Sequence, residues 1–419
     1  MTITTLGEPR FPSPLRQHVR DDLRLPATVL RNPATPAAPT DEFELAGPRA
    51  RLFFEPTTVR AGIVTCGGLC PGLNNVIRSL FLELQHGYGV QEILGFRDGY
   101  QGLDPARGRP PLRLTGDAVD KIHQEGGTLL GTSRGPVDTA LAVDNLIRLG
   151  VNMLFTIGGD GTQRGGNDLF QEARRRGHPL AVVGIPKTID NDVPFVSRTF
   201  GYLTAVEQAS AMLACAHTEA HSVRNGISIV KLMGRSAGFI TVGATLASQD
   251  VNFCLIPEIP FRLDGPGGLL AALTKRVLAR NHALIAVAEG AGQGLLAATG
   301  GTDASGNTKL ADIGPFLRDR IAAHFKAEKI EATLRYIDPS YLVRSVPADS
   351  EDAVLCDQFA RHAVHAAMAG KTGLVIGHLH DEFIHVPIEQ IVATTKQVDP
   401  QSPLWSAVLS STGQAARFE

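Results

Sequence analysis

The sequence predicts an α/β fold built from two similar doubly wound, Rossmann-like lobes with parallel sheets. Short, nearly continuous apolar runs alternate with helical patterns, and a glycine turn follows most of these runs. Strands that are apolar on both faces are typical of a parallel sheet covered by helices on both sides. The strand, glycine and helix unit near Gly67 resembles the one near Gly234, which indicates two lobes. The predicted strands cover 59–65, 154–157, 181–184, 227–232, 283–288 and 374–376.

Length and composition indicate a globular protein with more than one domain. The chain has 419 residues, more than one hydrophobic core usually holds. Apolar residues make up 43% and charged residues 20%, and the net charge of −2 gives no nucleic-acid footprint. The five cysteines are an odd number, which does not fit a disulfide framework. No apolar run is long enough for a signal core or a bilayer span, so a cytoplasmic location is expected.

Four segments are expected along the chain. Residues 1–57 read as a loosely packed N-terminal extension without regular strands or helices, because proline recurs there and removes backbone donors. An arm that contacts another subunit is the alternative. An α/β lobe over 58–195 and a second α/β lobe over 196–345 follow, and a C-terminal helical and strand segment over 346–419 completes the lobes. The predicted helices cover 73–85, 138–149, 168–176, 205–216, 268–280 and 352–368, with Asp138 and Asp352 as helix starts.

Two glycine-rich turns have the composition of a phosphate site. The segment 65–74, TCGGLCPGLN, ends a strand and opens a helix, and 155–166, FTIGGDGTQRGG, carries one carboxylate, Asp160, among its glycines. Glycine lets backbone N–H groups approach an anion closely, and a helix N-terminus favours negative charge. Mg²⁺ prefers one or two carboxylates together with waters. Plain tight turns with an Asx-type aspartate are the alternative interpretation.

The segment 184–194, GIPKTIDNDVP, places two carboxylates behind a buried strand. Asp190 and Asp192 flank Asn191, and Lys187 and Thr188 precede them. Of two such carboxylates, one can orient a metal ion and the other can accept a proton from a hydroxyl group. A polar surface turn would have the same composition, but the apolar strand directly before the segment argues against it.

Four further segments carry polar residues at strand ends or after glycine. They are 126–135 (GGTLLGTSRG), 230–239 (VKLMGRSAGF), 288–294 (AEGAGQG) and 335–345 (RYIDPSYLVRS). An arginine such as Arg134 can bind phosphate oxygens with a fork of donors, although packing or capping roles stay open for these segments. The run Gly370-Lys371-Thr372 lacks the glycine that a Walker A loop needs, and no HExxH or GxSxG pattern occurs.

Taken together and in order, GTSRG, GGDGT, PKTIDND, LMGR and AEGAG resemble the 6-phosphofructokinase family over roughly residues 59–346. The RNGIS and YIDPSY stretches are similar to its plant and trypanosomatid ATP-dependent branch. The resemblance implies two doubly wound lobes with the active site in the cleft between them. It implies that the lobe over 58–195 binds the nucleotide, that the lobe over 196–345 binds the sugar phosphate, and that the chain crosses back between the lobes. It also implies a glycolytic, Mg²⁺-dependent kinase that phosphorylates the 1-hydroxyl of fructose 6-phosphate to give fructose 1,6-bisphosphate.

The resemblance assigns a role to each matching position. Asp190 matches the general base, Thr188 a contact to the transferring phosphoryl group, and Asp160 the Mg²⁺ ligand, with Asp192 assisting through water. The donor-side matches are the phosphate-cradling Gly67, the nucleotide-contacting Tyr100, the loop residues Gly161, Thr162 and Gly165, and Lys187. Arg134 and Arg235 match arginines that bridge donor and acceptor phosphates, and the sugar-phosphate positions are Met233, Gly234, Glu289, Arg335, Tyr341 and Arg344.

The chain departs from the family pattern at two positions. Where short bacterial members have an arginine donated by a neighbouring subunit, this chain has Gly226, next to Asn225, and it has Tyr341 where many members have histidine. Binding of the 6-phosphate is therefore expected from Arg335, from Arg344 or from residues that the family pattern does not identify.

The phosphoryl donor is expected to be ATP. Pyrophosphate-dependent relatives of this pattern carry aspartate at the position of Gly161, where its side chain fills and repels the site of the nucleotide α-phosphate. Lys187 is the residue type of pyrophosphate-dependent relatives, so pyrophosphate dependence is the alternative. The plant-like ATP-dependent branch also combines this lysine with glycine, however, so Lys187 does not exclude ATP.

Other classes of protein fit the motifs less well. A lipid or dinucleotide kinase usually lacks the full PKTIDND and LMGR set, and an inactive regulatory subunit should have lost Asp190 or Asp160, which this chain keeps. A homo-oligomer is expected, with a tetramer preferred over a dimer. Allosteric effectors and the use of sedoheptulose 7-phosphate stay open.

Overall fold

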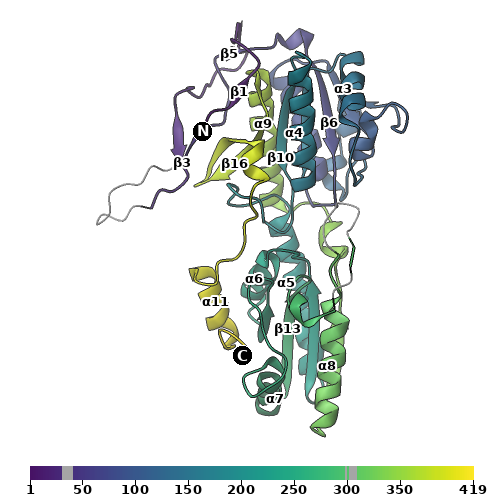
Figure 1. The fold of residues 1–419 in the computed structure, drawn as a ribbon, viewed down its shortest axis with the longest axis vertical. Coiled ribbons are helices and arrows are strands. Elements are labelled where there is room, and N and C mark those ends of the chain that lie inside the picture. The colour runs from purple at the N-terminus through teal and green to yellow at the C-terminus, as the bar shows by residue number, and fades with distance from the viewer. Residues whose placement is uncertain (31–40, 298–299, 302–308) are drawn as a thin grey trace. The chain divides into compact units, whose positions relative to one another are not determined.

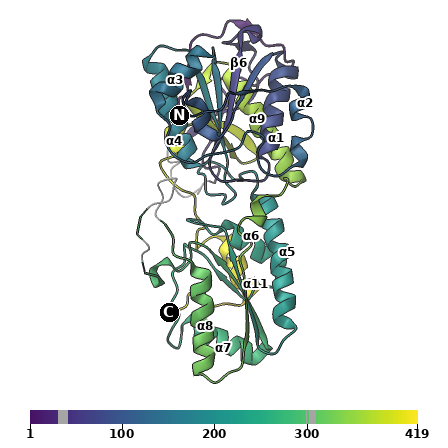
Figure 2. The ribbon, with the colours of Figure 1, turned by 90° about the vertical axis from the view of Figure 1, so that its right-hand side faces the viewer.

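The computed structural model describes residues 1–30, 41–297, 300–301 and 309–419. It divides into two compact units (Figures 1 and 2). Unit 1 comprises Met1–Thr188, Val193–Gly201 and Ser345–Thr394, and unit 2 comprises Ile189–Asp192, Tyr202–Arg344 and Thr395–Glu419. The chain thus leaves unit 1 inside the PKTIDND segment and again at residue 202. None of the helices in the described part of the chain combines the length and apolar character needed to cross a bilayer.

Unit 1 is built on a nine-stranded sheet with the order β3-β4-β17-β16-β10-β9-β6-β7-β8. The five central strands run parallel: β16 (Leu374–Leu379), β10 (Ala181–Pro186), β9 (Met153–Gly158), β6 (Arg60–Thr65) and β7 (Glu92–Phe96). The outer strands are antiparallel: β8 (Leu112–Arg113), β17 (Glu382–Pro387), β4 (Glu42–Leu45) and β3 (Arg24–Pro26).

Helices cover both faces of this sheet, as the apolar strands predict. Figure 2 shows α3 (Thr139–Arg148) and α4 (Asp160–Arg175) on one face, and α1 (Leu73–Leu82) and α9 (Ser350–Met368) on the other. Leu146, Leu154 and Leu169 belong to one buried cluster between α3, α4 and the strands. Short elements complete the unit: α2 (Gly116–Val119), α10 (Ile388–Ile391), the pair β1 (Thr4–Thr5) with β15 (Lys371–Thr372), and the pair β2 (Phe11–Pro12) with β5 (Arg51–Leu52).

Unit 2 is built on a four-stranded parallel sheet with the order β12-β13-β11-β14. Its strands are β12 (Phe253–Leu255), β13 (His282–Ala288), β11 (Gly226–Leu232) and β14 (Thr333–Ile337). The helices α5 (Tyr202–His221) and α6 (Phe239–Ser248) cover one face, and α7 (Leu269–Arg280) and α8 (Ile313–Ala327) cover the other (Figures 1 and 2). Ile227 and Ile229 point to the α7 and α8 side, where they join Leu273 and Leu317 in one cluster. The predicted α/β fold class is confirmed.

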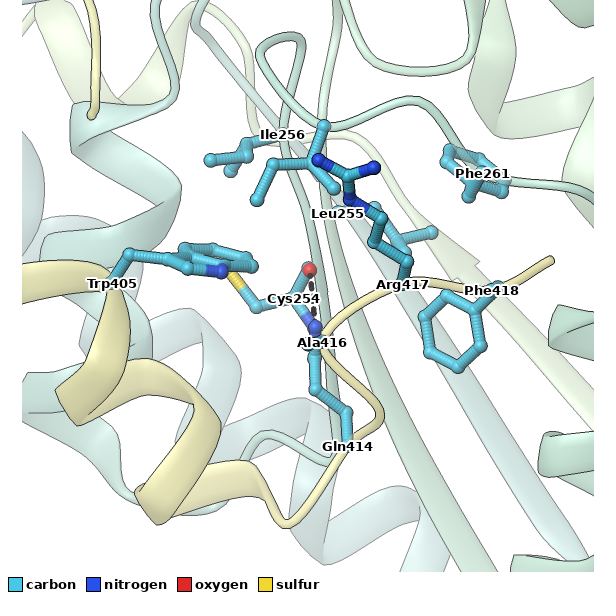
Figure 3. A pocket seen from close by; sticks show the side chains of 10 residues that line it. Cys254, Leu255, Ile256, Phe261, Trp405, Gln414, Ala416, Arg417 and Phe418 are labelled. Atoms are coloured by element: carbon cyan, nitrogen blue, oxygen red, sulfur yellow. Dashed lines mark hydrogen bonds between the residues drawn. The ribbon is translucent and has the colours of Figure 1, made fainter. Parts of the chain in front are cut away.

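The C-terminal segment of unit 2 covers the edge strand β12 (Figure 3). It begins with α11 (Pro403–Thr412) and continues to Glu419. The side-chain amide of Gln414 accepts from the backbone N–H of Cys254 at 2.7 Å and donates to its carbonyl at 3.2 Å. This amide therefore satisfies the backbone of an edge strand, as a neighbouring strand would. The cavity beside Trp405 and Phe418 measures only about 10 Å³, which is at the lower limit for one water molecule.

The six predicted strands and six predicted helices all occur, with shifted ends in several cases. The largest shift concerns α4, which begins at Asp160, although we predicted a helix from residue 168 after a glycine-rich loop. Asp138 caps α3 as predicted, through a bond from the N–H of Leu141 at 3.0 Å. The cap of α9 is Asp349 and not Asp352, because the carboxylate of Asp349 accepts from the N–H of Asp352 at 2.7 Å.

The prediction that the N-terminal extension lacks regular strands was wrong in its described part, since β4 pairs with β17 in the main sheet. Residues 31–40, where several of the prolines lie, are outside the described residues. A buried charge network fixes β4. One carboxylate oxygen of Glu44 lies 2.5 Å from Lys371 Nζ, 2.9 Å from Arg49 Nη2 and 3.1 Å from His385 Nδ1. These donors outweigh burial and hold the pKa of Glu44 well below its usual range.

Three histidines of unit 1, the buried His365 and His385 and the half-buried His362, should make folding sensitive to acid. Burial lowers the pKa of His362 and His365 to about 3 and that of His385 to about 4. An unfolded histidine titrates near 6.5, so below that pH the unfolded chain binds more protons than the folded chain. The free energy of unfolding should fall as pH drops from about 6.5 towards 4, by up to about 1.4 kcal/mol per pH unit for each histidine that stays neutral.

Chemical denaturation at pH 7, 6 and 5 measures this slope. His362→Phe should reduce the slope by up to one proton, because phenylalanine has no group that takes up a proton on unfolding. The variant should still fold, since the imidazole stacks on Phe383 with ring centroids 4.5 Å apart and phenylalanine preserves that stacking. An unchanged slope in this variant would contradict the assignment of His362 as a half-buried group that stays neutral in the folded chain.

Candidate active site

The donor side of the candidate site lies at the carboxyl ends of three adjacent parallel strands of unit 1. The loops after β6, β9 and β10 meet there, because these strands are neighbours in the order β10-β9-β6. The backbone N–H of Lys187 bonds to the carbonyl of Gly158 at 3.1 Å, and Lys187 Nζ donates to the carbonyl of Gly68. The structure thus brings the predicted Gly67, Asp160 and Lys187 segments together at the sheet edge where ligands of such folds bind.

Gly67 adopts a left-handed backbone with φ of +85°, and a Cβ there would lie 3.4 Å from Lys187 Nζ. Its own N–H donates to the carbonyl of Ser133 at 3.1 Å, and its carbonyl accepts from Thr132 Oγ1 at 2.7 Å. These two bonds attach the segment before Arg134 to the Gly67 turn. Arg134 itself is exposed next to this turn.

The GGDGT segment is helical from Asp160, and this differs from the loop that we predicted. Asp160 is the first residue of α4, so a helix N-terminus faces the strand ends and provides a favourable field for an anion. A Cβ at Gly165 would lie 2.6 Å from the ring of Tyr100, so this glycine makes room for the tyrosine. Gly161 is exposed, and no atom lies within 4 Å of a Cβ built there.

Tyr100 is buried against the first turns of α4 and is not exposed on the surface of that helix. The side chain is 5% exposed, and its hydroxyl donates to the carbonyl of Thr162 at 2.5 Å. Thr162 is itself buried, and its N–H bonds to the carbonyl of Gly159 at 2.9 Å. In this structure Tyr100 and Thr162 therefore support the first turn of α4, on which Gly161 is exposed.

The acceptor side of the candidate site lies at the carboxyl ends of β11 and β13 in unit 2. Met233, Gly234 and Arg235 follow β11, and Glu289 follows β13, as predicted. The N–H of Glu289 bonds to the carbonyl of Leu232 at 2.9 Å. The two loops also pack closely, since a Cβ at Gly290 would lie 1.9 Å from the carbonyl oxygen of Arg235. The structure therefore brings the LMGR and AEGAG motifs together.

The charges on this acceptor side are mixed. Burial raises the pKa of Glu289, and the positive charges of Arg235, Lys231 and Arg344 oppose that rise. Lys231 pairs with Asp338 at 2.7 Å and with Asp312 at 3.0 Å. Arg344 lies over the ring of Tyr341, 4.8 Å from its centroid, while 71% of Tyr341 is exposed.

Arg335 lies apart from these loops within unit 2. It stands on β14 in register with Ser228, four positions before β11 ends at Leu232. Its guanidinium is exposed and lies 3.6 Å from Glu219 of α5. Within one chain, the described unit 2 does not bring Arg335 to Met233, Gly234 and Arg235.

The segment that carries Asp190 joins the two units. Thr188 belongs to unit 1, where its carbonyl accepts from Thr199 Oγ1 at 2.7 Å, whereas Ile189–Asp192 belong to unit 2. Asp190 and Asp192 are half-buried, and one carboxylate oxygen of Asp190 is shielded from solvent. Between them, Asn191 is 6% exposed and adopts a left-handed φ of +54°.

Our sequence analysis missed two side chains that hold the donor side together. The Gln163 amide nitrogen lies 2.9 Å from the carbonyl of Gly158 and 3.3 Å from that of Ile185, so it ties the ends of β9 and β10. Asn74 accepts from the N–H of Leu129 at 2.7 Å and donates to the carbonyl of Glu125 at 3.2 Å, which holds the loop that leads to Arg134. Asn74 and Gln163 lie within the glycine-rich segments 65–74 and 155–166, and that position is the signal that could have identified them.

Comparison with known proteins agrees with this arrangement. The family model described as Phosphofructokinase matches residues 60–367. The ATP-dependent 6-phosphofructokinase of Borreliella burgdorferi is 49% identical over 88% of this chain and 85% of its own length. The corresponding protein of Amycolatopsis methanolica is 45% identical over 100% of this chain and 95% of its own length, and that of Trypanosoma brucei brucei is 47% identical over 88% and 76%.

Solved structures share the fold at lower identity. A pyrophosphate-dependent phosphofructokinase from Marinobacter aquaeolei superposes with a TM-score of 0.70 at 19% identity, over 84% of this chain and 91% of that one. At such identity the likeness shows the fold alone. The family model matches most of the chain, and the relatives span nearly all of it. The chain therefore belongs to the phosphofructokinase family.

Proposed function

We propose that this protein is an ATP-dependent 6-phosphofructokinase, which transfers the γ-phosphoryl group of ATP to the 1-hydroxyl of fructose 6-phosphate. The observation that carries the proposal is the 45–49% identity to relatives with that activity over 88–100% of the chain. The geometry agrees with it, since the donor and acceptor motifs each stand at the carboxyl ends of parallel strands. The product would be fructose 1,6-bisphosphate.

On the donor side, the chain would bind the phosphates of ATP through backbone and charge. The N-terminus of α4, the Gly67 turn and Lys187 lie at one edge of the sheet, and each favours an anion. Gly161 leaves open space at the first turn of α4, where an aspartate would place a negative charge. This open space supports ATP over pyrophosphate. Tyr100 would act by supporting the helix from below, and Arg134 would neutralise charge on the transferring group.

The residues present fit a bound Mg²⁺. Asp160 supplies a hard carboxylate oxygen at the first residue of α4, next to where the phosphates would bind. In the described residues no group of three or more His, Cys, Asp or Glu side chains could form an all-protein metal site. Mg²⁺ commonly binds through one or two carboxylates together with substrate phosphates, so this composition suits it. When bound, the ion would neutralise charge that develops on the phosphates.

On the acceptor side, we assign Asp190 as the general base that takes the proton from the sugar 1-hydroxyl. Phosphoryl transfer depends mainly on alignment and charge stabilisation, so we assign most of the remaining work to the base and to the arginines of the acceptor loops. The positive charges of Arg235 and Arg344 act on Glu289, and we assign these three side chains to the sugar phosphate. Thr188 would contact the phosphoryl group, with Asp192, Met233 and Gly234 completing the acceptor contacts.

Location, assembly and the alternative donor also belong to this proposal. We expect a cytoplasmic homo-oligomer, with a tetramer preferred over a dimer. Arg335 would then serve the sugar phosphate only through contacts beyond those of unit 2 in one chain. Lys187 is the residue type found in pyrophosphate-dependent relatives of this pattern, so pyrophosphate is the alternative donor.

Steady-state turnover of fructose 6-phosphate with Mg²⁺, measured side by side with ATP and with pyrophosphate, tests the proposed function. We expect turnover with ATP and none with pyrophosphate. Sedoheptulose 7-phosphate in the same assay measures whether the acceptor side is selective. Turnover with pyrophosphate alone would be compatible with the fold and with Asp190 as the base. It would show, however, that Lys187 and not Gly161 indicates which phosphoryl donor the enzyme uses. No turnover with either donor would contradict the proposed function.

A further inference from the structure

The residue between the two acceptor-side carboxylates has an unusual backbone. Asn191 has a φ of +54°, and it is 6% exposed. A non-glycine residue in this left-handed region is uncommon, although asparagine tolerates it better than most. The backbone of Asn191 determines how the side chains of Asp190 and Asp192 diverge. Whatever fixes Asn191 therefore also fixes the direction of the proposed base.

Lys396 contacts this segment twice, although it lies 205 positions further along the chain. Its Nζ donates to Asn191 Oδ1 at 3.1 Å, and its backbone N–H donates to the carbonyl of Asp192 at 2.8 Å. All three residues belong to unit 2, Lys396 through the C-terminal segment that starts at Thr395. One bond fixes the side chain of Asn191 and the other fixes the backbone directly after it.

The residues around Lys396 continue this attachment to the acceptor loop. Gln397 Nε2 donates to the carbonyl of Ser236 at 2.9 Å. The N–H of Val398 bonds to Glu258 Oε1 at 2.8 Å, and the same oxygen accepts from the N–H of Gly238 at 2.9 Å. Residues 396–398, here called the C-terminal strap, therefore join the Asp190 segment to the loop that carries Arg235.

The ammonium group of Lys396 lies in a half-buried and partly apolar site. It lies 5.2 Å from the centroid of the Phe239 ring. Burial lowers its pKa to about 8, and the nearby charge of Asp192 partly opposes this. Removing an ammonium from water costs free energy that an apolar side chain would not lose. Packing alone would favour an apolar residue, so the amine has a positioning task.

We propose that Lys396 is a positioning residue, which holds Asn191 and thereby aims the Asp190 carboxylate at the acceptor hydroxyl. This inference rests on the proposed function for the identity of the acceptor. The strap as a whole keeps the base and Arg235 in one arrangement. A base displaced by about 1 Å can lose about a hundredfold in rate, so this positioning has a measurable effect.

Lys396→Met tests the inference, because methionine keeps much of the aliphatic stem and removes the amine. We expect kcat to fall about 10- to 100-fold, with the KM for ATP and the thermal unfolding midpoint close to the parent values. Lys396→Arg, which retains a cation and donors, should recover part of kcat. Lys275→Met, an exposed lysine of α7, is the matched control and should keep the parent kcat. A parent-like kcat in Lys396→Met would overturn the inference.

A double-mutant cycle with Asn191→Gly separates positioning from general stability. Glycine accepts the left-handed backbone but lacks the amide that Lys396 holds. If the bond between them is the cause, the double variant should lose no more kcat than the worse single variant. Independent, additive losses would overturn the inference.

Hydrogen exchange distinguishes a failure of the inference from a failure of the proposed function. Backbone amides of residues 189–193 should exchange faster in Lys396→Met than in the parent, and Lys275→Met should match the parent. This readout needs no substrate, so it holds even if the parent enzyme does not phosphorylate fructose 6-phosphate. Unchanged exchange in Lys396→Met would contradict the strap itself.

Discussion

Replacing Asp190 with serine should lower kcat by roughly a hundredfold to ten thousandfold, which is the range that a positioned general base contributes. Asp190 is half-buried in Ile189–Asp192, so a smaller polar residue can replace it without opening the core. The KM for ATP should stay close to the parent value, because Asp190 belongs to unit 2 whereas Gly67, Asp160 and Lys187 belong to unit 1.

The neighbouring Asp192→Asn is the matched comparison for Asp190. It removes the second carboxylate charge of the same segment but keeps the backbone carbonyl that accepts from the N–H of Lys396. If Asp190 is the base, Asp192→Asn should cost less in kcat than Asp190→Ser. A larger loss of kcat in Asp192→Asn than in Asp190→Ser would show that we assigned the proton transfer to the wrong carboxylate.

The pH profile gives a second readout for the base. A general base must be ionised, so kcat/KM of the parent should fall on the acid side of its optimum. In Asp190→Ser the residual activity should lose this acid limb, because no carboxylate at that position remains to be protonated. Retention of the same limb would indicate that another group controls it. Because the depressed pKa values of His362, His365 and His385 weaken folding in acid, thermal unfolding should be measured at each pH, and only points at which the enzyme stays folded enter the profile.

The strands and their glycine turns were predictable because their signals are local. Strands such as β9 and β13 are buried on both faces, so they appear in the sequence as short apolar runs. Parallel neighbours then place the loops after Gly158 and Ala288 at one edge of each sheet without any further information. The motifs carrying Asp160, Arg235 and Glu289 are therefore assigned to strand ends by the sequence alone.

The helical state of the GGDGT segment was not predictable from local propensity. Glycine is a poor helix former, so the run suggested a loop up to residue 168. Tertiary packing reverses this preference, because Tyr100 packs on Gly165 and Thr156 packs on Gly166. Larger residues there would collide with these neighbours, as a Cβ at Gly165 would lie 2.6 Å from the Tyr100 ring. Here the glycines serve helix packing as well as access to the first turn.

Long-range polar contacts also escape sequence reasoning. Nothing local marks Lys396 as a partner of Asn191, since the two residues are 205 positions apart. The same holds for Glu44, which looked like part of a loose extension and is instead surrounded by Lys371, Arg49 and His385. A polar side chain that lies inside one unit but far along the chain shows its role only when the fold is known.

The second large effect is expected from Gly161→Asp, which should remove most activity with ATP while leaving the fold intact. No atom lies within 4 Å of a Cβ at this position, so the new side chain enters open space and displaces nothing. An acidic residue in the first turn of α4 also interacts favourably with the helix dipole, by about 0.3–1 kcal/mol. Thermal unfolding should therefore be unchanged or slightly raised, and a loss of activity could not be attributed to misfolding.

The loss with ATP follows from where the new carboxylate would stand. It would occupy the exposed start of α4, the position at which we place the nucleotide phosphates, and it would add volume and a negative charge there. We expect kcat/KM for ATP to fall at least about a hundredfold, since two like charges in a partly desolvated site repel by several kcal/mol.

Two further variants at the same position serve as controls. Gly161→Asn adds nearly the same volume without charge, and Gly161→Ala adds only the Cβ. A graded loss from alanine through asparagine to aspartate would separate sterics from charge repulsion. If ATP turnover survived Gly161→Asp intact, Gly161 could not be the residue that selects the donor. Lys187 would then have to be considered as the residue that determines donor choice.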